Sequence, residues 1–312
     1  MNRILIAEAL GFSPRALERL ATVGDVTPAD LDRDGLLSAV ATTTVLWVRL
    51  RHRIDAEVIA RAPELRIIAS PTTGLDHIDL EEAARRQIEV ISLRGATEFL
   101  KDVRATAELT IALILSVLRH VPAASRDVLT GRWDRDLFKG RELRGKTVGL
   151  VGLGRLGTLV ARYLHAFGAH LIATDPHGIG SEHVAMTSLP ELLATSDIVS
   201  IHVNLTPETR GLIGREQIRG MKPGAVLINT ARGEIVDSGA LLEGLQSGRL
   251  AGAALDVLPN EHAGVVNQPL VAYAREHPEL IITPHIGGCT YESMEQTEVF
   301  LAERVCAALS PR

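Results

Sequence analysis

The chain has 312 residues, a length typical of about two domains, and 46% of its residues are hydrophobic and 23% charged. Its 33 basic and 38 acidic residues give a net charge of −5, and only 3% of the residues are aromatic. These figures argue against a nucleic-acid partner, since proteins that bind nucleic acids usually carry a basic face and aromatic stacking platforms. Two cysteines, Cys289 and Cys306, are too few for a disulfide framework or a thiolate zinc site, so we expect free thiols and no metal.

The N-terminal segment lacks the pattern of a secretory signal, because acidic Glu8 interrupts the apolar residues before an h-region can form. The longest apolar run, at residues 111–118, spans about two helical turns, whereas a membrane helix needs about 20 residues. The sequence therefore predicts a soluble cytoplasmic protein without a membrane partner.

The first hundred residues alternate β-branched runs with helical patterns, which predicts βαβ units and a parallel sheet. Ser13 and Pro14 have the types expected of a helix N-cap and a first helical residue. The predicted strands are at residues 3–7, 45–48, 65–69 and 89–92. The predicted helices are at residues 14–20, 54–60 and 80–86.

A second alternating series predicts the inventory of a doubly wound dinucleotide-binding domain, after a domain boundary near residues 98–104. Residues 105–119 are apolar on nearly all sides, which predicts a helix buried between two bodies. The six predicted strands are at residues 147–153, 171–175, 198–203, 225–229, 252–257 and 280–283. Further helices are predicted at residues 155–167, 188–194, 214–219, 238–247 and 291–309, and we expect the last of them to be a packing partner of the first domain.

A glycine-rich turn of the form G-x-G-x-x-G follows the first strand of this series and precedes a predicted helix. Gly152 permits the tight turn, Gly154 lets the backbone approach a pyrophosphate, and Gly157 allows close packing of helix on strand. Asp175 ends the next strand, where a carboxylate can accept hydrogen bonds from the adenosine ribose and repels a 2′-phosphate. No arginine follows directly, so the pattern predicts NAD rather than NADP. A glycine turn that serves packing alone is the alternative.

Arg232, Glu261 and His285 each follow one of the last three predicted strands, where open α/β sheets place their ligands. Hydride transfer to a 2-keto acid needs a cation to hold the carboxylate and an acid to protonate the nascent alkoxide. Arginine suits the first role because its planar fork stays protonated, and histidine suits the second because its pKa lies near neutral pH. A neighbouring glutamate would raise the pKa of the histidine. Each residue alone is more often a solvated charge or a loop residue, but their joint placement favours a catalytic site.

The sequence resembles the D-isomer-specific 2-hydroxyacid dehydrogenase family in residues 73–79, 152–157, 221–237, 253–261 and 283–288. The resemblance implies an α/β fold with a doubly wound Rossmann NAD-binding domain at residues 101–286. A smaller, discontinuous flavodoxin-like substrate domain would comprise residues 1–100 and 287–312, with a cleft between the two. The resemblance also implies hydride transfer in which Arg232 binds the 2-hydroxy or 2-keto acid, His285 is the acid/base and Glu261 pairs with it. A homodimer joined through the NAD-binding domains is implied as well.

The family motifs further imply which residues contact the ligands. The implied NAD contacts are Thr73, Gly152, Gly154, Arg155, Leu156, Gly157, Asp175, Val203, Thr230, Ala231, Asp256, Gly287 and Gly288. The backbone near Thr72 and Gly74 would hold the substrate carboxylate. Two positions depart from the family pattern: Asn204 stands where proline is usual, and Cys289 replaces a common serine. We expect Cys289 to be a small buried residue, with an oxidation-sensitive thiol as the alternative.

Within the family, three segments of the sequence resemble the phosphoglycerate dehydrogenases: residues 48–51, residues 107–110, and residues 131–135 with the following residues 142–147. Their resemblance implies that basic residues at Arg49, Arg51 and Arg135 reach a phosphorylated substrate, since a phosphate needs two or more fixed cations. Alternatively, residues 51–53 are a solvated charge cluster, and the substrate is a smaller acid such as glyoxylate or hydroxypyruvate. Because the chain ends soon after its final predicted helix, we expect no appended regulatory domain.

A non-catalytic NAD-sensing protein is a second functional class to consider. Transcriptional corepressors that resemble this family retain the arginine, glutamate and histidine, so these residues do not exclude that reading. Such proteins usually carry long disordered extensions for their partners, and this sequence shows none. We therefore expect an enzyme.

Overall fold

The computed structural model describes residues 1–178 and 180–310, and these divide into two compact units. The first unit contains residues 1–103 together with the C-terminal segment that begins at Cys289. The second unit contains residues 104–288. Pro311 and Arg312, which the sequence analysis includes in the substrate domain, lie outside the described residues.

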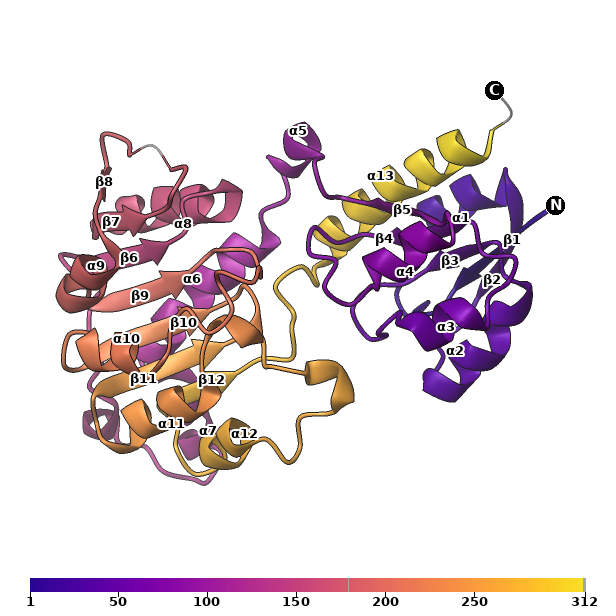
Figure 1. The fold of residues 1–312 in the computed structure, drawn as a ribbon. Coiled ribbons are helices and arrows are strands. Elements are labelled where there is room, and N and C mark those ends of the chain that lie inside the picture. Colours follow the sequence, from indigo (N-terminus) through magenta and orange to yellow (C-terminus); the bar gives the residue numbers. More distant parts are fainter. Residues whose placement is uncertain (179, 311–312) are drawn as a thin grey trace. The chain divides into compact units, whose positions relative to one another are not determined.

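In the first unit, five parallel strands form a sheet in the order β2-β1-β3-β4-β5 (Figure 1). The strands are β1 (Asn2–Ile6), β2 (Gly24–Pro28), β3 (Val45–Trp47), β4 (Ile67–Ser70) and β5 (Glu89–Ser92). This order is the one found in flavodoxin-like folds. The flavodoxin-like fold class predicted for this part of the chain is therefore confirmed.

Helices cover both faces of this sheet because successive strand residues point to opposite sides. Ile4 and Ile6 pack with α1 (Pro14–Ala21) and α13 (Tyr291–Leu309), whereas Leu5 packs on the other face with α2 (Arg33–Ala39) and α3 (Ala56–Ala60). The C-terminal helix α13 thus completes a core that the first hundred residues alone leave open. The remaining helices of the unit are η1 (Val40–Thr42), α4 (Leu80–Arg85) and α5 (Thr97–Leu100).

The predicted start of α1 is confirmed. The Ser13 hydroxyl accepts a hydrogen bond from the Ala16 backbone N–H at 3.3 Å, and Pro14 occupies the first helical position. An N-cap of this kind satisfies a backbone donor that the helix itself leaves without an acceptor.

In the second unit, seven parallel strands form a sheet in the order β12-β11-β10-β9-β6-β7-β8. The strands are β6 (Thr147–Val151), β7 (His170–Thr174), β8 (Val184–Met186), β9 (Ile198–Ile201), β10 (Ala225–Asn229), β11 (Leu250–Leu255) and β12 (Leu280–Ile282). The first three strands run outward in one direction from β6 and the next four run the other way from β9. This doubly wound order confirms the Rossmann fold and puts the switch point between β6 and β9, where such sheets bind their ligands.

Two helical layers cover the second sheet. One face carries α6 (Ala105–Leu118) and α8 (Arg155–Ala166), and the other carries α9 (Leu189–Thr195), α10 (Arg215–Gly220), α11 (Ser238–Gln246) and α12 (Pro269–Ala274). The other helical elements of the unit are α7 (Val121–Val128), η2 (Arg135–Phe138), η3 (Gly233–Ile235) and η4 (Glu261–Ala263). In α6, buried side chains such as Leu113 and Ile114 explain the apolar pattern, because this helix packs on α8 and on β10 and β11 within the unit.

The strands β2 and β8 are not predicted from the sequence. Because β8 belongs to the second unit, the prediction of six strands for that unit is one short. Both are edge strands, and β2 contains glycine, aspartate and proline, which are depleted in strands. The helices α2, α5, α7 and α12 are not predicted either. Each is eight residues or shorter, too short for a helical period to stand out.

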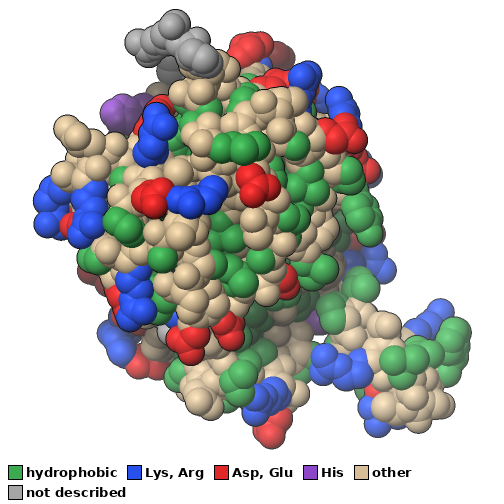
Figure 2. All heavy atoms as spheres, turned by 90° about the vertical axis from the view of Figure 1, so that its right-hand side faces the viewer, with side chains coloured by type: hydrophobic (Ala, Val, Ile, Leu, Met, Phe, Trp, Pro, Cys, Tyr) green, Lys and Arg blue, Asp and Glu red, His purple; other side chains and the backbone are tan. Residues whose placement is uncertain are grey.

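On the face of the molecule that Figure 2 shows, basic and acidic side chains are interspersed. No single helix within residues 1–178 and 180–310 is long and apolar enough to cross a membrane. A bent pair, residues 97–118 with α7, passes that test by length and composition only, and α6 supplies a large part of the core of its unit.

Candidate active site

The glycine-rich turn connects β6 to α8 in the second unit. Gly152 has a φ of +99°, in the left-handed region, and a Cβ there would lie 2.8 Å from the backbone of His202. A Cβ on Gly157 would lie 2.2 Å from the Gly152 carbonyl oxygen, so only glycine lets α8 approach the strand this closely. At Gly154, no described atom lies within 4 Å of the Cβ position, which leaves the start of α8 accessible to a phosphate group. The residues of this turn therefore fit a bound dinucleotide.

Asp175 follows β7 at the neighbouring strand end and is hydrogen-bonded to the glycine turn. Its Oδ2 accepts from the Leu153 backbone N–H and its Oδ1 from the His177 backbone N–H, both at 2.8 Å. Partial burial would raise the pKa of Asp175, but these backbone hydrogen bonds outweigh it and hold the pKa below its usual value. An ionised carboxylate consequently stands beside the turn.

The other residues predicted to contact NAD in this unit lie at the carboxyl ends of its strands or at the start of α8. Arg155 and Leu156 open α8, and burial lowers the pKa of the Arg155 guanidinium. Val203 follows β9, and Thr230 and Ala231 follow β10. These positions lie on both sides of the switch point between β6 and β9, as a ligand bound there requires.

Arg232 lies three residues beyond β10, in a turn that packs against the segment leading to Glu261. Its Nη1 donates to the Ala231 carbonyl oxygen at 2.8 Å. A Cβ on Gly233 would lie 2.1 Å from the carbonyl carbon of Leu258, so the two segments are in backbone contact. The fold thereby brings the Arg232 turn against the segment that carries Glu261.

Glu261 and His285 form a hydrogen-bonded pair. Oε1 of Glu261 is bonded to Nδ1 of the imidazole, and Oε2 accepts from the Leu258 backbone N–H at 3.2 Å. Burial alone would raise the pKa of Glu261, but the hydrogen bond and charge of His285 hold the pKa below its ordinary value. The glutamate therefore stays ionised at neutral pH, next to the ring nitrogen that it orients.

His285 has a φ of +54°, which places it in the left-handed region that residues other than glycine rarely adopt. Asp256 holds this turn. Its backbone carbonyl accepts from the His285 N–H at 2.8 Å, and its carboxylate accepts from Ile286 N–H at 2.9 Å and Gly287 N–H at 2.7 Å. Burial raises the pKa of Asp256 in spite of these bonds. The role of Asp256 in holding the His285 turn was not predicted from the sequence, although an aspartate at the end of a buried strand could have indicated it.

In the first unit, Thr72, Thr73 and Gly74 form the turn that follows β4. The Thr72 hydroxyl donates to the Gly74 carbonyl oxygen at 2.8 Å and lies 2.9 Å from the Ser70 hydroxyl. Thr73 is exposed and Thr72 and Gly74 are half-buried, so the backbone of this turn is accessible.

Arg49 and Arg51, predicted to bind a phosphate, both form ion pairs inside the first unit. Nε of Arg49 donates to Oε1 of Glu298 at 2.9 Å, and this glutamate side chain is only 1% exposed. Arg51 pairs with Asp30 at 2.7 Å on the surface. Part of the positive charge expected to meet a phosphate is thus already neutralised by carboxylates.

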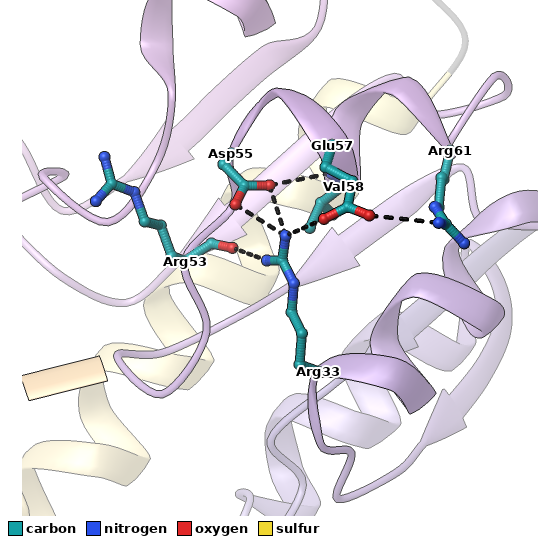
Figure 3. A network of polar contacts seen from close by, with 6 residues as sticks. All are labelled: Arg33, Arg53, Asp55, Glu57, Val58 and Arg61. Carbon is teal, nitrogen blue, oxygen red and sulfur yellow. Dashed lines mark hydrogen bonds and ion pairs between the residues drawn. The ribbon is translucent and has the colours of Figure 1, made fainter. Parts of the chain in front are cut away.

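The loop after β3 is held from outside by α2. Arg33 donates to the Arg53 carbonyl oxygen at 2.7 Å and to both carboxylate oxygens of Asp55 at 2.8 Å (Figure 3). In Figure 3 the Arg53 side chain points away from this network. The expectation that residues 51–53 form a uniformly solvated charge cluster is wrong at His52, which is 4% exposed.

Arg135 and Cys289 complete the predicted positions. Arg135 is exposed at the start of η2, in the second unit. The expectation that Cys289 is buried is wrong: it is exposed, directly before Thr290, the N-cap of α13. Both cysteines are free thiols, as predicted. Within the described part of the chain, no group of three or more His, Cys, Asp or Glu side chains could hold a metal ion.

Comparison with known proteins identifies related sequences and folds. A family model described as "D-isomer specific 2-hydroxyacid dehydrogenase, NAD binding domain" matches residues 111–287, more than half of the chain. The chain is 38% identical to D-3-phosphoglycerate dehydrogenase of Mycobacterium tuberculosis over 98% of its own length. It spans only 57% of that relative.

Other relatives are matched over most of their length. Glyoxylate reductase of Thermofilum pendens is 40% identical, with 89% of this chain and 81% of that protein covered. The crystal structure of D-lactate dehydrogenase from Aquifex aeolicus, complexed with NAD and lactic acid, is 29% identical with a TM-score of 0.85. That comparison covers 98% of this chain and 95% of the other. The phosphoglycerate dehydrogenase and the glyoxylate reductase, which are named for different substrates, thus match this chain at similar identity.

Proposed function

Because the chain belongs to the D-isomer-specific 2-hydroxyacid dehydrogenase family and its second unit is an NAD-binding domain, we propose that it interconverts a D-2-hydroxy acid and its 2-keto acid. The observation that carries this proposal is the Glu261–His285 pair, located in the same unit as the dinucleotide turn and Arg232. An imidazole hydrogen-bonded through Nδ1 keeps Nε2 for a proton that it exchanges with a ligand.

In the proposed reduction, Arg232 binds the carboxylate of the 2-keto acid through its guanidinium fork. NAD, when bound at the glycine turn, supplies the hydride in its reduced form and accepts it in its oxidised form. His285 donates its Nε2 proton to the carbonyl oxygen, which becomes the hydroxyl of the product. Glu261 stabilises the imidazolium before that transfer and keeps the ring oriented during it. From the first unit, we propose that the backbone of residues 72–74 donates to the substrate carboxylate.

The experiment is a comparison of wild type, His285→Ala and Glu261→Gln by NADH oxidation with a panel of 2-keto acids. Removal of a general acid should lower kcat by roughly 10²–10⁴-fold, while NADH binding measured by fluorescence persists. Turnover of His285→Ala near the wild-type rate would refute the catalytic role. Tight NADH binding by wild type without turnover of any acid would instead indicate a sensor protein.

For the substrate, 3-phosphoglycerate is the first candidate, because the phosphoglycerate dehydrogenase match extends over 98% of this chain. An unphosphorylated acid such as glyoxylate or hydroxypyruvate is the second candidate. It is favoured by the ion pairs of Arg49 with Glu298 and of Arg51 with Asp30, since cations already paired offer less to a phosphate. Ratios of kcat/KM for hydroxypyruvate and its 3-phosphate would decide between the two.

We also propose a homodimer formed through the second unit. Five large apolar side chains lie exposed on α7 and the residues after it: Val121, Val128, Leu129, Trp133 and Leu137. Exposed apolar side chains clustered along one segment are typical of association surfaces. Sedimentation equilibrium should give twice the chain mass, and a monomer at micromolar concentration would contradict the proposal.

A further inference from the structure

We infer that Asn229 is a positioning residue that fixes the turn presenting Arg232 to the substrate carboxylate. The inference rests on the proposed function, because it gives Asn229 a role only through Arg232. It concerns a side chain that neither the family match nor the sequence analysis assigns to the site.

Asn229 is the last residue of β10 and is 1% exposed. Its Oδ1 accepts a hydrogen bond from the Ala231 backbone N–H at 3.0 Å, and its Nδ2 donates to the Arg232 carbonyl oxygen at 2.9 Å. One end of the amide must therefore accept and the other must donate. Among side chains of this length, only the carboxamide offers both, since a carboxylate is an acceptor at both oxygens.

The two hydrogen bonds of Asn229 hold two peptide units of the turn. Between these two lies a third peptide unit, whose carbonyl contacts the Arg232 guanidinium. The first bond fixes the peptide between Thr230 and Ala231, and the second fixes the peptide after Arg232. The peptide between them carries the Ala231 carbonyl, which accepts from Nη1 of Arg232 at 2.8 Å. The direction of that carbonyl, and with it the direction of the guanidinium, consequently depends on the bonds that Asn229 makes.

The rest of the turn is anchored at its two ends. At its start, the Thr230 hydroxyl lies 2.9 Å from the buried Thr110 hydroxyl of α6. At its end, Gly233 is in backbone contact with Leu258. Between these points, Asn229 supplies side-chain hydrogen bonds that reach both Ala231 and Arg232. The Arg232 carbonyl oxygen also accepts from the Ile235 backbone N–H at 3.3 Å, so loss of the Asn229 side chain would leave the ends of the turn in place and its middle held less tightly.

This arrangement predicts a specific kinetic defect. A catalytic or binding group displaced by about 1 Å can lose on the order of 10²-fold in rate. Asn229→Ala should therefore lower kcat/KM for the 2-keto acid that is reduced fastest by about 10- to 100-fold, mainly through KM. The dissociation constant of NADH should change less than KM, because only Thr230 and Ala231 of the predicted NAD contacts lie in this turn, whereas the glycine turn and Asp175 lie on other strands.

A double-mutant cycle with Arg232→Ala separates positioning from a general effect on folding. If Asn229 acts through Arg232, Asn229→Ala should have an effect of less than about threefold in the Arg232→Ala background. Asn229→Ser supplies a second variant: its hydroxyl can accept from the Ala231 N–H but does not reach the Arg232 carbonyl oxygen as well. Ile228→Val is the matched control, since Ile228 is the buried apolar neighbour on β10, and its kcat/KM should stay at the wild-type value.

The outcomes are distinguishable. Equal fold losses from Asn229→Ala in the wild-type and Arg232→Ala backgrounds would overturn the inference, as would unchanged kcat/KM in both Asn229 variants. Should Asn229→Ala fail to fold, Asn229→Ser carries the same cycle. A wild-type kcat/KM in Arg232→Ala itself would refute the proposed role of Arg232, and the inference about Asn229 with it.

Discussion

Arg49 in the first unit and Arg232 in the second each follow the carboxyl end of a parallel strand, β3 and β10 respectively. The Arg49 guanidinium is bonded to the buried carboxylate of Glu298 and to the Leu10 carbonyl oxygen. Arg232 donates to the carbonyl of its own neighbour and belongs to a turn that packs beside the Glu261 segment. The first arginine joins distant segments of one core, whereas the second is presented by a turn.

Carboxylates at the strand ends of the two units are used in different ways too. Glu8, beyond β1, accepts from the backbone N–H groups of Arg49 at 3.0 Å and Arg51 at 3.2 Å. It thereby fixes the loop that carries those arginines. Asp175, beyond β7, accepts from the Leu153 N–H and stands beside a glycine turn whose Gly154 has open space around it. A charged residue at a strand end is therefore not by itself a sign of a ligand site. Its hydrogen-bond partners indicate whether it holds a loop of the fold or stands beside a ligand site.

The largest effect that tests this comparison is expected for Arg49→Met. Removing one partner of a buried ion pair leaves an uncompensated charge, here the carboxylate of Glu298. We expect the free energy of unfolding to fall by about 3 kcal/mol, measured by urea denaturation, with kcat of the folded enzyme little changed.

Arg51→Met is the matched control for Arg49→Met. Both partners of the Arg51–Asp30 pair are close to half exposed, and an exposed pair contributes at most about 1 kcal/mol. Equal losses of stability in the two variants would contradict the structural role assigned to Arg49. A selective rise in KM for a phosphorylated acid in both variants would instead indicate that Arg49 and Arg51 bind the phosphate.

A smaller effect is expected for the pH dependence of stability, to which we expect His202 in the second unit and His52 in the first to contribute. Burial lowers the pKa of His202, beyond β9, to about 4, and its Nε2 lies 2.9 Å from the Ser200 hydroxyl. The unfolded chain protonates this histidine near its ordinary pKa of 6.5, so stability should fall as the pH drops from about 6.5 toward 4. Between pH 7 and pH 5 the expected loss is about 2 kcal/mol.

His202→Gln should flatten this pH dependence, as read from urea midpoints at pH 7 and pH 5. Burial also lowers the pKa of His52 in the first unit, but the charge of Glu8 acts in the opposite direction. His52→Gln should therefore change the pH dependence less than His202→Gln does. The reverse order would show that the imidazole of the second unit is the better solvated of the two.

The sequence predicted most of the site-bearing elements because their signals are local. The glycine turn, the apolar strand before it and the aspartate after the next strand lie within 28 residues of one another, from Val148 to Asp175. Doubly wound folds repeat this local pattern, so the two sheets could be anticipated from periodicity and turn residues alone. The edge strands β2 and β8 were missed because their hydrophobic pattern is short and interrupted.

Partners that are distant in sequence could be predicted only where the family resemblance implied them, as for Glu261 and His285. Arg49 and Glu298 are 249 positions apart, and the sequence near either residue does not indicate the other. The same holds for the burial of His52. Such pairings follow from how the helices and loops pack, which local propensity does not determine.

The smallest expected effect concerns the choice between NADH and NADPH. It is tested at two carboxylates, Asp175 after β7 in the second unit and Glu8 after β1 in the first. Asp175→Ala removes a negative charge next to the glycine turn, so the preference for NADH over NADPH in kcat/KM should narrow by about tenfold. Asp175→Asn separates charge from geometry. Its single acceptor oxygen can serve the Leu153 N–H while the His177 N–H loses its bond, so NADH kinetics should fall less than in Asp175→Ala while NADPH improves.

Glu8→Gln is the control for Asp175, since Glu8 holds backbone groups of the first unit in the way that Asp175 holds those of the second. We expect Glu8→Gln to leave the ratio of NADH to NADPH turnover unchanged, because this carboxylate follows β1 and holds the loop after β3 rather than the dinucleotide turn. If both substitutions shift the ratio equally, cofactor choice reflects the net charge of the protein rather than a ribose contact. If neither shifts it, the ribose is recognised by another residue, and Asp175 serves only to hold the glycine turn against β7.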